Sequence, residues 1–177
     1  MRQPPKTDPD PRMTSFPSST GTRNSMPGGA DATTIPRAAL ILGAAGFIPF
    51  ALFCVAAIMA PPRYVLQAHF ALNFYGAVIL SFMGGVHWGL EMARQQHDAN
   101  APTFKALGIS VLPSLAAFAA LAMPVHYGAV ALAVCFALLL AYDLYCAKAG
   151  LAPAWYPKLR IPLTIAVCLA VLLPSAV

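Results

Sequence analysis

The apolar residues of this chain come in long uninterrupted runs that are separated by short charged segments. The longest run, from Ala106 to Tyr142, holds 37 residues without a single Asp, Glu, Lys or Arg. As one helix it would be roughly 55 Å long, whereas the hydrocarbon core of a bilayer is about 30 Å thick. We therefore expect two membrane spans in this run, divided where Pro124 removes a backbone donor and where His126 and Tyr127 supply interfacial side chains.

The same pattern predicts three further spans, and the fold class is therefore an all-α membrane protein, a five-transmembrane-helix bundle. Each apolar run is long enough to cross the hydrocarbon core as a helix. Pro49 and Pro113 fall inside spans, where neighbouring helices can satisfy the backbone groups that proline leaves free. The predicted spans lie within one domain of residues 37–177, at about 38–60, 68–90, 106–123, 125–142 and 159–176.

The first 36 residues have a different composition from the rest of the chain. They hold seven prolines, ten Ser or Thr and almost no large apolar residues. Such a segment has too little apolar surface to offset the entropy of folding. We expect residues 1–36 to form a disordered cytoplasmic tail rich in Pro, Ser and Thr.

The basic residues predict an orientation for the bundle. Cytoplasmic loops are enriched in Lys and Arg. If the N-terminus is cytoplasmic, ten of the eleven basic residues fall on the inner side and only Arg63 falls outside. The prediction is a cytoplasmic N-terminus and, after five spans, a periplasmic C-terminus.

Composition excludes several classes of protein. Hydrophobic residues make up 59% of the chain and charged residues 10%, against about 25% charged residues in soluble domains. The net charge of +5 does not indicate nucleic-acid binding, because the basic residues lie beside the spans rather than on one element. The expected partners are the lipid bilayer and other membrane-protein subunits.

The second span carries one face that is polar or small along its whole length. This face must point into the bundle, since a lipid-facing Asn or Glu is costly; its members are His69, Asn73, Gly76, Leu80, Gly84, His87 and Glu91. An overlapping row of small residues, spaced by four, predicts close contact with another helix. We call this row the small-residue ridge: Asn73, Ala77, Ser81, Gly85 and Gly89.

Charges of both signs are predicted to gather at the inner ends of four spans. They either form interfacial ion pairs that fix the helix ends, or build a site for an anionic headgroup, a quinone or a proton. Together with two polar residues toward the outer end of the second span, the candidate polar site comprises Arg37, His69, Asn73, His87, Glu91, Asp143 and Arg160.

The sequence offers little support for cofactors or catalysis. His69 and His126 are both expected at outer helix ends, where a haem held by two histidines would need them, but two histidines reach matching depth easily by chance. The chain contains no nucleophile motif, phosphate-binding glycine loop or Cys/His metal cluster. We therefore expect no catalytic residues, no metal and no cofactor, and we do not favour an enzyme.

Two segments resemble a known family of membrane proteins, domain of unknown function 3429. They are YGAVILSFMGGVHWG from Tyr75 to Gly89 and WYPKLRIPLT from Trp155 to Thr164. The resemblance extends over roughly residues 36–175 and includes LGAAGFIPF from Leu42 to Phe50. It implies a multi-spanning protein of bacterial membranes or the mitochondrial inner membrane, and it implies no activity.

Three functional hypotheses remain open from the sequence. The leading one is a non-enzymatic packing or assembly component of a larger membrane complex, because the small-residue ridge is clear and the signs of chemistry are few. The alternatives are a small proton-coupled transporter and a lipid- or quinone-binding membrane protein. The composition, rich in Ala and Pro, favours the bacterial inner membrane over the mitochondrial one.

Overall fold

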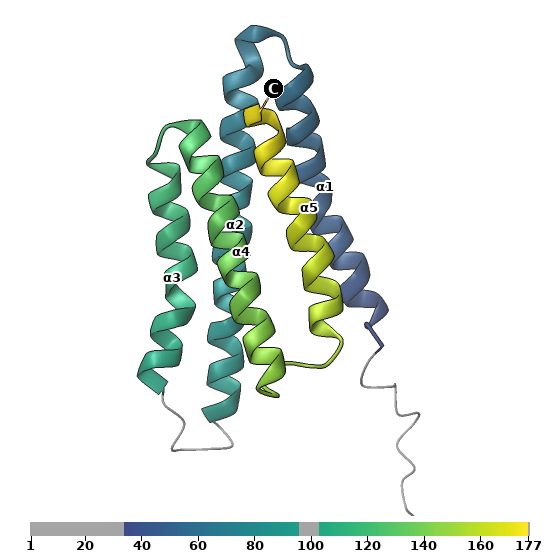
Figure 1. Cartoon of the computed structure of the whole chain (residues 1–177), viewed down its shortest axis with the longest axis vertical. Coiled ribbons are helices and arrows are strands. Elements are labelled where there is room, and N and C mark those ends of the chain that lie inside the picture. The colour runs from purple at the N-terminus through teal and green to yellow at the C-terminus, as the bar shows by residue number, and fades with distance from the viewer. Residues whose placement is uncertain (1–33, 96–102, 177) are drawn as a thin grey trace, which may run out of the picture. The chain divides into compact units, whose positions relative to one another are not determined.

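The computed structural model describes residues 34–95 and 103–176, which form five helices (Figure 1). All five helices are long and apolar enough to cross a membrane, and the predicted five-transmembrane-helix bundle is confirmed. The tail predicted for residues 1–36 lies outside the described residues except for 34–36. The helices are α1 (Arg37–Met59), α2 (Pro62–Gln95), α3 (Thr103–Leu121), α4 (Val125–Lys148) and α5 (Tyr156–Ala176).

Helices α2 and α4 extend furthest beyond the spans predicted for them. Helix α2 begins at Pro62 and ends at Gln95, and α4 continues to Lys148, whereas the predicted spans were 68–90 and 125–142. The extra turns carry charged and aromatic side chains. They suit the headgroup regions, which raise the thickness of a bilayer from about 30 Å to about 40–45 Å, so a helix need not end where the hydrocarbon ends.

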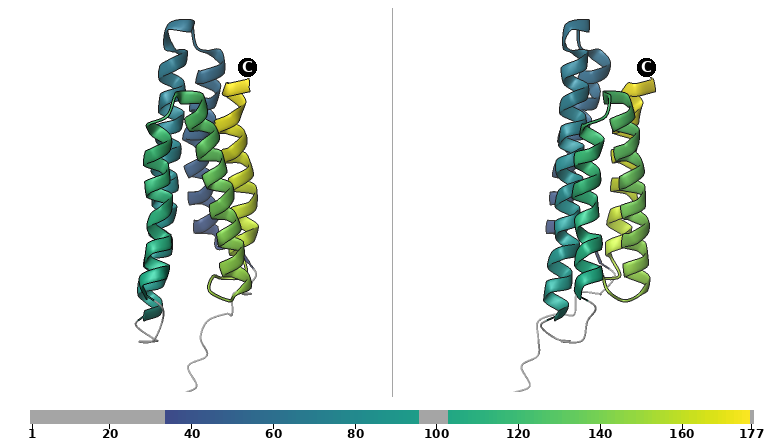
Figure 2. Two further views of the ribbon diagram at one scale, coloured as in Figure 1. Left: turned by 60° about the vertical axis from the view of Figure 1, so that its left-hand side comes forward. Right: turned by 90° about the vertical axis from the view of Figure 1, so that its left-hand side faces the viewer.

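Helix α2 is the central element of the bundle, and it packs against each of the other four helices. Around it, α3 packs on α4, α4 on α5 and α5 on α1, and Figures 1 and 2 show α3 at one side of the bundle with α4 between α3 and α5. The two connections Ala60–Pro61 and Ala122–Pro124 are short. They make α1–α2 and α3–α4 antiparallel pairs.

The core lies where α1, α2 and α4 meet at mid-height. Phe50 of α1 lies edge-on to Phe136 of α4, with ring centroids 6.2 Å apart, and to Tyr75 of α2, at 4.9 Å. The Tyr75 hydroxyl donates a hydrogen bond of 2.9 Å to the carbonyl of Gly46. This contact satisfies the one polar atom of the ring cluster and joins α1 to α2.

The outward surface of the bundle is apolar on every helix. Large side chains such as Phe74, Phe118 and Leu138 are more than half exposed. A soluble domain rarely exposes contiguous apolar area on this scale. The outward faces therefore contact the lipid bilayer.

Candidate functional site

Three helices bring a histidine, an aspartate and an arginine together at one end of the bundle. Asp143 of α4 is 1% exposed. Its Oδ1 accepts a hydrogen bond of 2.7 Å from Nε2 of His87 on α2, and its Oδ2 accepts one of 2.7 Å from Nε of Arg160 on α5. We call these residues the buried triad, and the end where they lie the charged end. They are three of the residues that the sequence predicted for a polar site.

The local sequence explains why the triad forms here. His87 lies near the C-terminal end of α2 and Asp143 near that of α4, while Arg160 lies in the second turn of α5. Because α5 runs antiparallel to α4, the beginning of α5 meets the end of α4. A buried carboxylate is stable only with charged or hydrogen-bonding partners, and the two neighbouring helices each supply one.

The ionic states of the triad follow from the hydrogen bonds. A carboxylate oxygen only accepts, so Nε2 of His87 must carry the proton that it donates to Asp143. In a neutral ring, Nδ1 is then an acceptor. The charges of Asp143 and Arg160 compensate each other, and His87 is the member of the triad that can change the net charge by gaining a proton.

Glu91 forms a second and separate pair at the charged end. Its Oε2 accepts a hydrogen bond of 3.0 Å from Nη1 of Arg94, one turn away on α2. Its Oε1 is buried and has no partner among the described residues. A small polar pocket of about 30 Å³ joins this pair to the triad, and it is lined by both of these residues together with His87, Tyr142 and Cys146.

Arg37 does not join the cluster that the sequence placed around it. It lies at the first residue of α1, is exposed, and forms no ion pair with any residue in 34–95 or 103–176. A shared depth in the membrane is therefore not enough to predict that two charged residues are in contact. Contact also requires that the side chain point toward the neighbouring helix.

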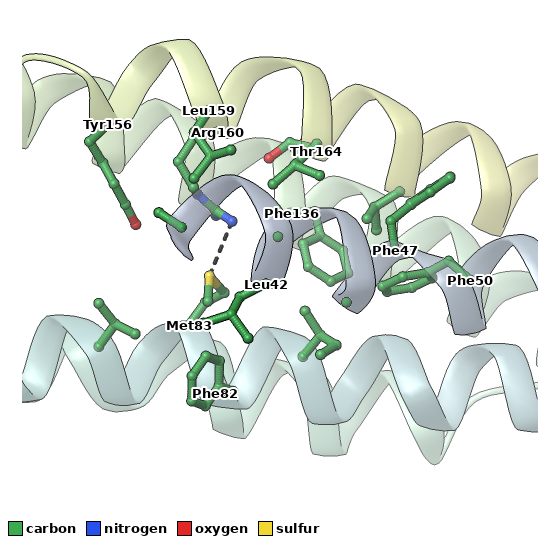
Figure 3. A pocket seen from close by; sticks show the side chains of 17 residues that line it. Leu42, Phe47, Phe50, Phe82, Met83, Phe136, Tyr156, Leu159, Arg160 and Thr164 are labelled. Atoms are coloured by element: carbon green, nitrogen blue, oxygen red, sulfur yellow. Dashed lines mark hydrogen bonds between the residues drawn. The ribbon is translucent and has the colours of Figure 1, made fainter. Parts of the chain in front are cut away.

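A cavity of about 320 Å³ lies beside the triad, between α1, α2 and α5 (Figure 3). Its walls are apolar apart from the charged end, and they include Phe47 and Phe50 of α1, Met83 of α2 and Phe136 of α4. At the charged end, Tyr156, Arg160 and Thr164 of α5 line the same cavity. An apolar chamber with a few polar groups at one end is the usual form of a small-molecule site.

Two residues that line the cavity each have a buried polar atom with unused hydrogen-bonding capacity. Nη2 of Arg160 and Oγ1 of Thr164 are buried and have no partner among the described residues. The remaining guanidinium nitrogen, Nη1, donates only to the Met83 sulfur, at 3.1 Å, and a thioether is a weak acceptor. Figure 3 shows this contact crossing from α5 to α2. Unpaired buried donors are costly, so this wall is suited to a ligand that carries acceptor oxygens.

The other two residues of the predicted polar site lie near the opposite end of α2. His69 is buried, with Nδ1 2.9 Å from the Val65 carbonyl and Nε2 3.2 Å from the Pro174 carbonyl. Asn73 donates a hydrogen bond of 2.8 Å to the carbonyl of Val125. Both side chains hold helices together: His69 joins α2 to α5, and Asn73 joins α2 to α4.

The histidine pair considered for haem is in contact. The rings of His69 and His126 lie edge-on, with centroids 5.5 Å apart. Both nitrogens of His69 lie within hydrogen-bond distance of carbonyl oxygens, and the nitrogen that carries the proton has no lone pair for iron. Within 34–95 and 103–176, no group of three or more His, Cys, Asp or Glu side chains is arranged to hold a metal ion.

The small-residue ridge is buried at one end and exposed at the other. Asn73 and Ala77 are buried, whereas Gly85 and Gly89 are exposed, and a Cβ added to either glycine meets no atom within 4 Å. Ser81 lies between them with intermediate exposure. The inner half of the ridge therefore faces away from the rest of the chain.

The closest helix contacts involve two other glycines. A Cβ on Gly84 of α2 would lie 2.6 Å from the Ser110 carbonyl of α3, and one on Gly128 of α4 would lie 2.6 Å from the Ala120 carbonyl of α3. Helix α3 thus approaches the backbones of α2 and α4 directly. Small residues at helix interfaces permit this approach in membranes.

Sequence reasoning missed Met83, Tyr156 and Thr164, which complete the cavity with Arg160. Met and Thr are ordinary residues of membrane helices, and neither stands out from its neighbours. Tyr156 lies in the segment WYPKLRIPLT, which carried the family resemblance, and it was given no role there. The signal that could have located them is their spacing, since Tyr156, Arg160 and Thr164 recur every four residues and so share one face of α5.

The comparisons with known proteins agree with this architecture. Residues 35–176 match the family described as a protein of unknown function, DUF3429. The chain is 35% identical over 136 residues to Transmembrane protein 69 of Xenopus tropicalis, an alignment that covers 73% of this chain and 50% of that protein. The chain thus spans about half the length of that relative. No solved structure matches the chain.

The family match covers all five helices and both segments on which the resemblance was based. The predicted relationship is therefore confirmed, and the chain belongs to the DUF3429 family of membrane proteins.

Proposed function

We propose that this chain binds a membrane amphiphile of the lipid or quinone kind in the cavity between α1, α2 and α5. The single observation that carries the proposal is that Arg160, a residue lining that cavity, has a buried Nη2 with no hydrogen-bond partner among the described residues. A buried guanidinium normally has all its donors paired, because an unmatched buried donor costs about 1–3 kcal/mol or more. A ligand oxygen near Arg160 and Thr164 removes this cost.

The position of the cavity supports entry from the bilayer. Leu42 of α1 and Phe82 of α2 line the cavity, and these side chains are 72% and 63% exposed. The cavity is therefore reached from the lipid-facing surface between α1 and α2. An amphiphile dissolved in the membrane can place its apolar part along the phenylalanines and its head beside Arg160 without crossing water.

The interior of the bundle favours a site at one end over a path through the molecule. Leu80, Leu132 and Phe136 are each at most 2% exposed, and they lie between the triad and the polar residues near the opposite end of α2. A proton-coupled transporter would need its polar groups linked across this layer. The geometry thus favours binding over the transport alternative.

A pair of glycine substitutions tests the cavity. Gly46 lines it, and a Cβ there meets no atom within 4 Å, so Gly46→Leu should fill the chamber without moving the backbone. Native mass spectrometry of the chain purified in mild detergent should detect a small molecule on the wild type and lose it in Gly46→Leu. Gly85→Leu is the matched control, since it adds the same side chain on an open external face.

Two results would contradict the proposal. One is equal retention of the bound molecule in Gly46→Leu and in the wild type. The other is a wild-type chain that carries nothing after extraction and takes up neither lipid nor quinone when these are added back to it.

The second candidate function is a packing or assembly component of a larger membrane complex. The observation that favours it is the exposed inner half of the ridge at Gly85 and Gly89, where a helix of another protein can approach the backbone of α2 closely. The same two variants test it in the opposite sense. Gly85→Leu should lose proteins that co-purify with the wild type, and Gly46→Leu should retain them.

We place the protein in the bacterial inner membrane, with the charged end toward the cytoplasm and the C-terminus in the periplasm. The distribution of Lys and Arg supports this orientation: Arg63 is the one basic residue at the opposite end of the helices. The mitochondrial inner membrane, with the charged end toward the matrix, is the alternative, and the eukaryotic relative keeps it open.

A further inference from the structure

We infer that the amphiphile has a singly anionic head, and that its binding is coupled to the uptake of one proton by His87. This inference rests on the proposed amphiphile-binding function and names the class of ligand and the linkage at the same cavity. The step is a simple association: the anion binds beside Arg160, one proton from water joins Nδ1 of His87, and no covalent bond between heavy atoms changes.

The donors in the cavity wall favour an anion over a neutral head. Nη2 of Arg160 and Oγ1 of Thr164 both lack a hydrogen-bond acceptor among the described residues. The hydrogen bond from Nη1 to the Met83 sulfur is easily exchanged for a stronger one to a ligand oxygen. Hydrogen bonds from a guanidinium to an anionic oxygen are roughly twice as strong as those between neutral groups. A carboxylate, phosphate or sulfonate oxygen therefore gains most from this wall.

The buried charges are already balanced before a ligand binds. Among the described residues, the charged groups buried at this end are Asp143, Arg160 and Glu91. Asp143 pairs with Arg160, and Glu91 pairs with the more exposed Arg94. An anion added beside Arg160 leaves a net negative charge in a region of low dielectric, which is unfavourable unless a positive charge accompanies it.

His87 is the group placed to supply that charge. It touches Asp143 directly and lines the small polar pocket at the charged end. The titratable and charged residues around His87 are Glu91 and Arg94 of α2, Tyr142, Asp143 and Cys146 of α4, and Tyr156 and Arg160 of α5. The residues that α3 contributes to the pockets around His87 are Ala106, Ile109, Ser110, Leu112, Pro113 and Ala116.

The small pocket gives the proton a route to His87. A volume of about 30 Å³ is enough for one water molecule. Such a water would lie beside His87 and Glu91, which both line the pocket, and it can deliver a proton to the His87 ring. Once charged, His87 still donates Nε2–H to Asp143, so the triad keeps its geometry while its net charge rises by one.

The probe for the test is hexadecyl sulfonate, whose head stays anionic throughout the pH range of the experiment. The full-length protein in non-ionic detergent, in weakly buffered solution near pH 7.5, is titrated with the probe while a pH indicator reports proton uptake. Empty micelles give the background. We expect net uptake of protons when the sulfonate binds, and an affinity that falls as the pH rises.

Three controls isolate the linkage. His87→Gln can still donate a hydrogen bond to Asp143 but cannot become charged, so it should bind the sulfonate with no proton uptake and little pH dependence. His126→Gln, at an exposed histidine of the opposite end, should behave as the wild type. Hexadecanol, which has the same chain and a neutral head, should bind at least tenfold more weakly than the sulfonate and take up no proton.

The outcomes separate this inference from the proposed function. Sulfonate binding without proton uptake, or uptake that survives in His87→Gln, overturns the linkage but leaves the amphiphile site standing. Stronger binding of hexadecanol or of decylubiquinone than of the sulfonate overturns the anionic class in favour of a neutral ligand. Failure of all three probes to bind the wild type above the level of Gly46→Leu overturns the proposed function itself.

Discussion

Asp143 is the residue on which the charged end of the molecule depends. Each of its carboxylate oxygens accepts one hydrogen bond of 2.7 Å, from a different helix, and the side chain is buried. Breaking a buried ion pair by removing one partner leaves the other charge uncompensated, which costs about 3–5 kcal/mol. Glu91 forms a weaker pair, because the side chain of its partner Arg94 is 44% exposed.

Asp143→Asn should therefore lower the free energy of unfolding by about 3–5 kcal/mol, because the charge of Arg160 is left unpaired. Glu91→Gln should change it by no more than about 1 kcal/mol. Unfolding in mixed micelles of mild detergent and dodecyl sulfate, followed by circular dichroism, measures both. Equal losses in the two variants would show that the triad is not the main polar contact of this end.

At the scale of the element, α2 shows how much of the structure could be predicted. Its polar face was expected to point inward, and His69, Asn73 and Glu91 are indeed buried. Which glycine of α2 contacts a neighbouring helix was harder to predict, because Gly84 and Gly85 are alike in sequence and differ only in their angle around the helix. Which of them meets a neighbour depends on how α3 lies against α2, and that is decided by contacts with Ser110 and Pro113.

The cavity could not be predicted for a similar reason. It requires α5 to lie beside α1, and no short-range pattern in the sequence indicates which helices of a membrane bundle are neighbours. The triad was partly predictable, since a helix end places a charge at a known depth. Arg37 shows the limit of that reasoning: it lies at the expected end of α1, yet it is exposed and outside the cluster.

The two adjacent glycines of α2 give a prediction at this scale. Gly84→Ala should destabilise the protein by about 1–3 kcal/mol, the usual cost of overpacking, because its Cβ would lie 2.6 Å from the Ser110 carbonyl. Gly85→Ala should be neutral or up to about 1 kcal/mol stabilising, because alanine favours a helix over glycine. Thermal unfolding in detergent compares the two. A milder effect at Gly84 than at Gly85 would contradict the α2–α3 contact.

For the whole molecule, five spans put the beginning of α1 and the end of α5 on opposite sides of the membrane. The proposed orientation, with the charged end inside, is a prediction from the Lys and Arg distribution. A reporter active only in the periplasm should be active when fused after Val177 and inactive when fused between Gln95 and Ala101. A reporter active only in the cytoplasm should give the reverse pattern. Both fusions on the same side would exclude five spans.

The order of the helices along the chain also sets the order in which the cavity is made during synthesis. Helices α1 and α2 are joined by two residues and precede α5, which supplies Arg160 and Thr164, so they are inserted before it. Until then, the α1–α2 wall of the cavity is open to lipid along its full height. An amphiphile resting on that wall would be enclosed when α5 docks, so the proposed ligand would be acquired during biogenesis as well as by later entry from the bilayer.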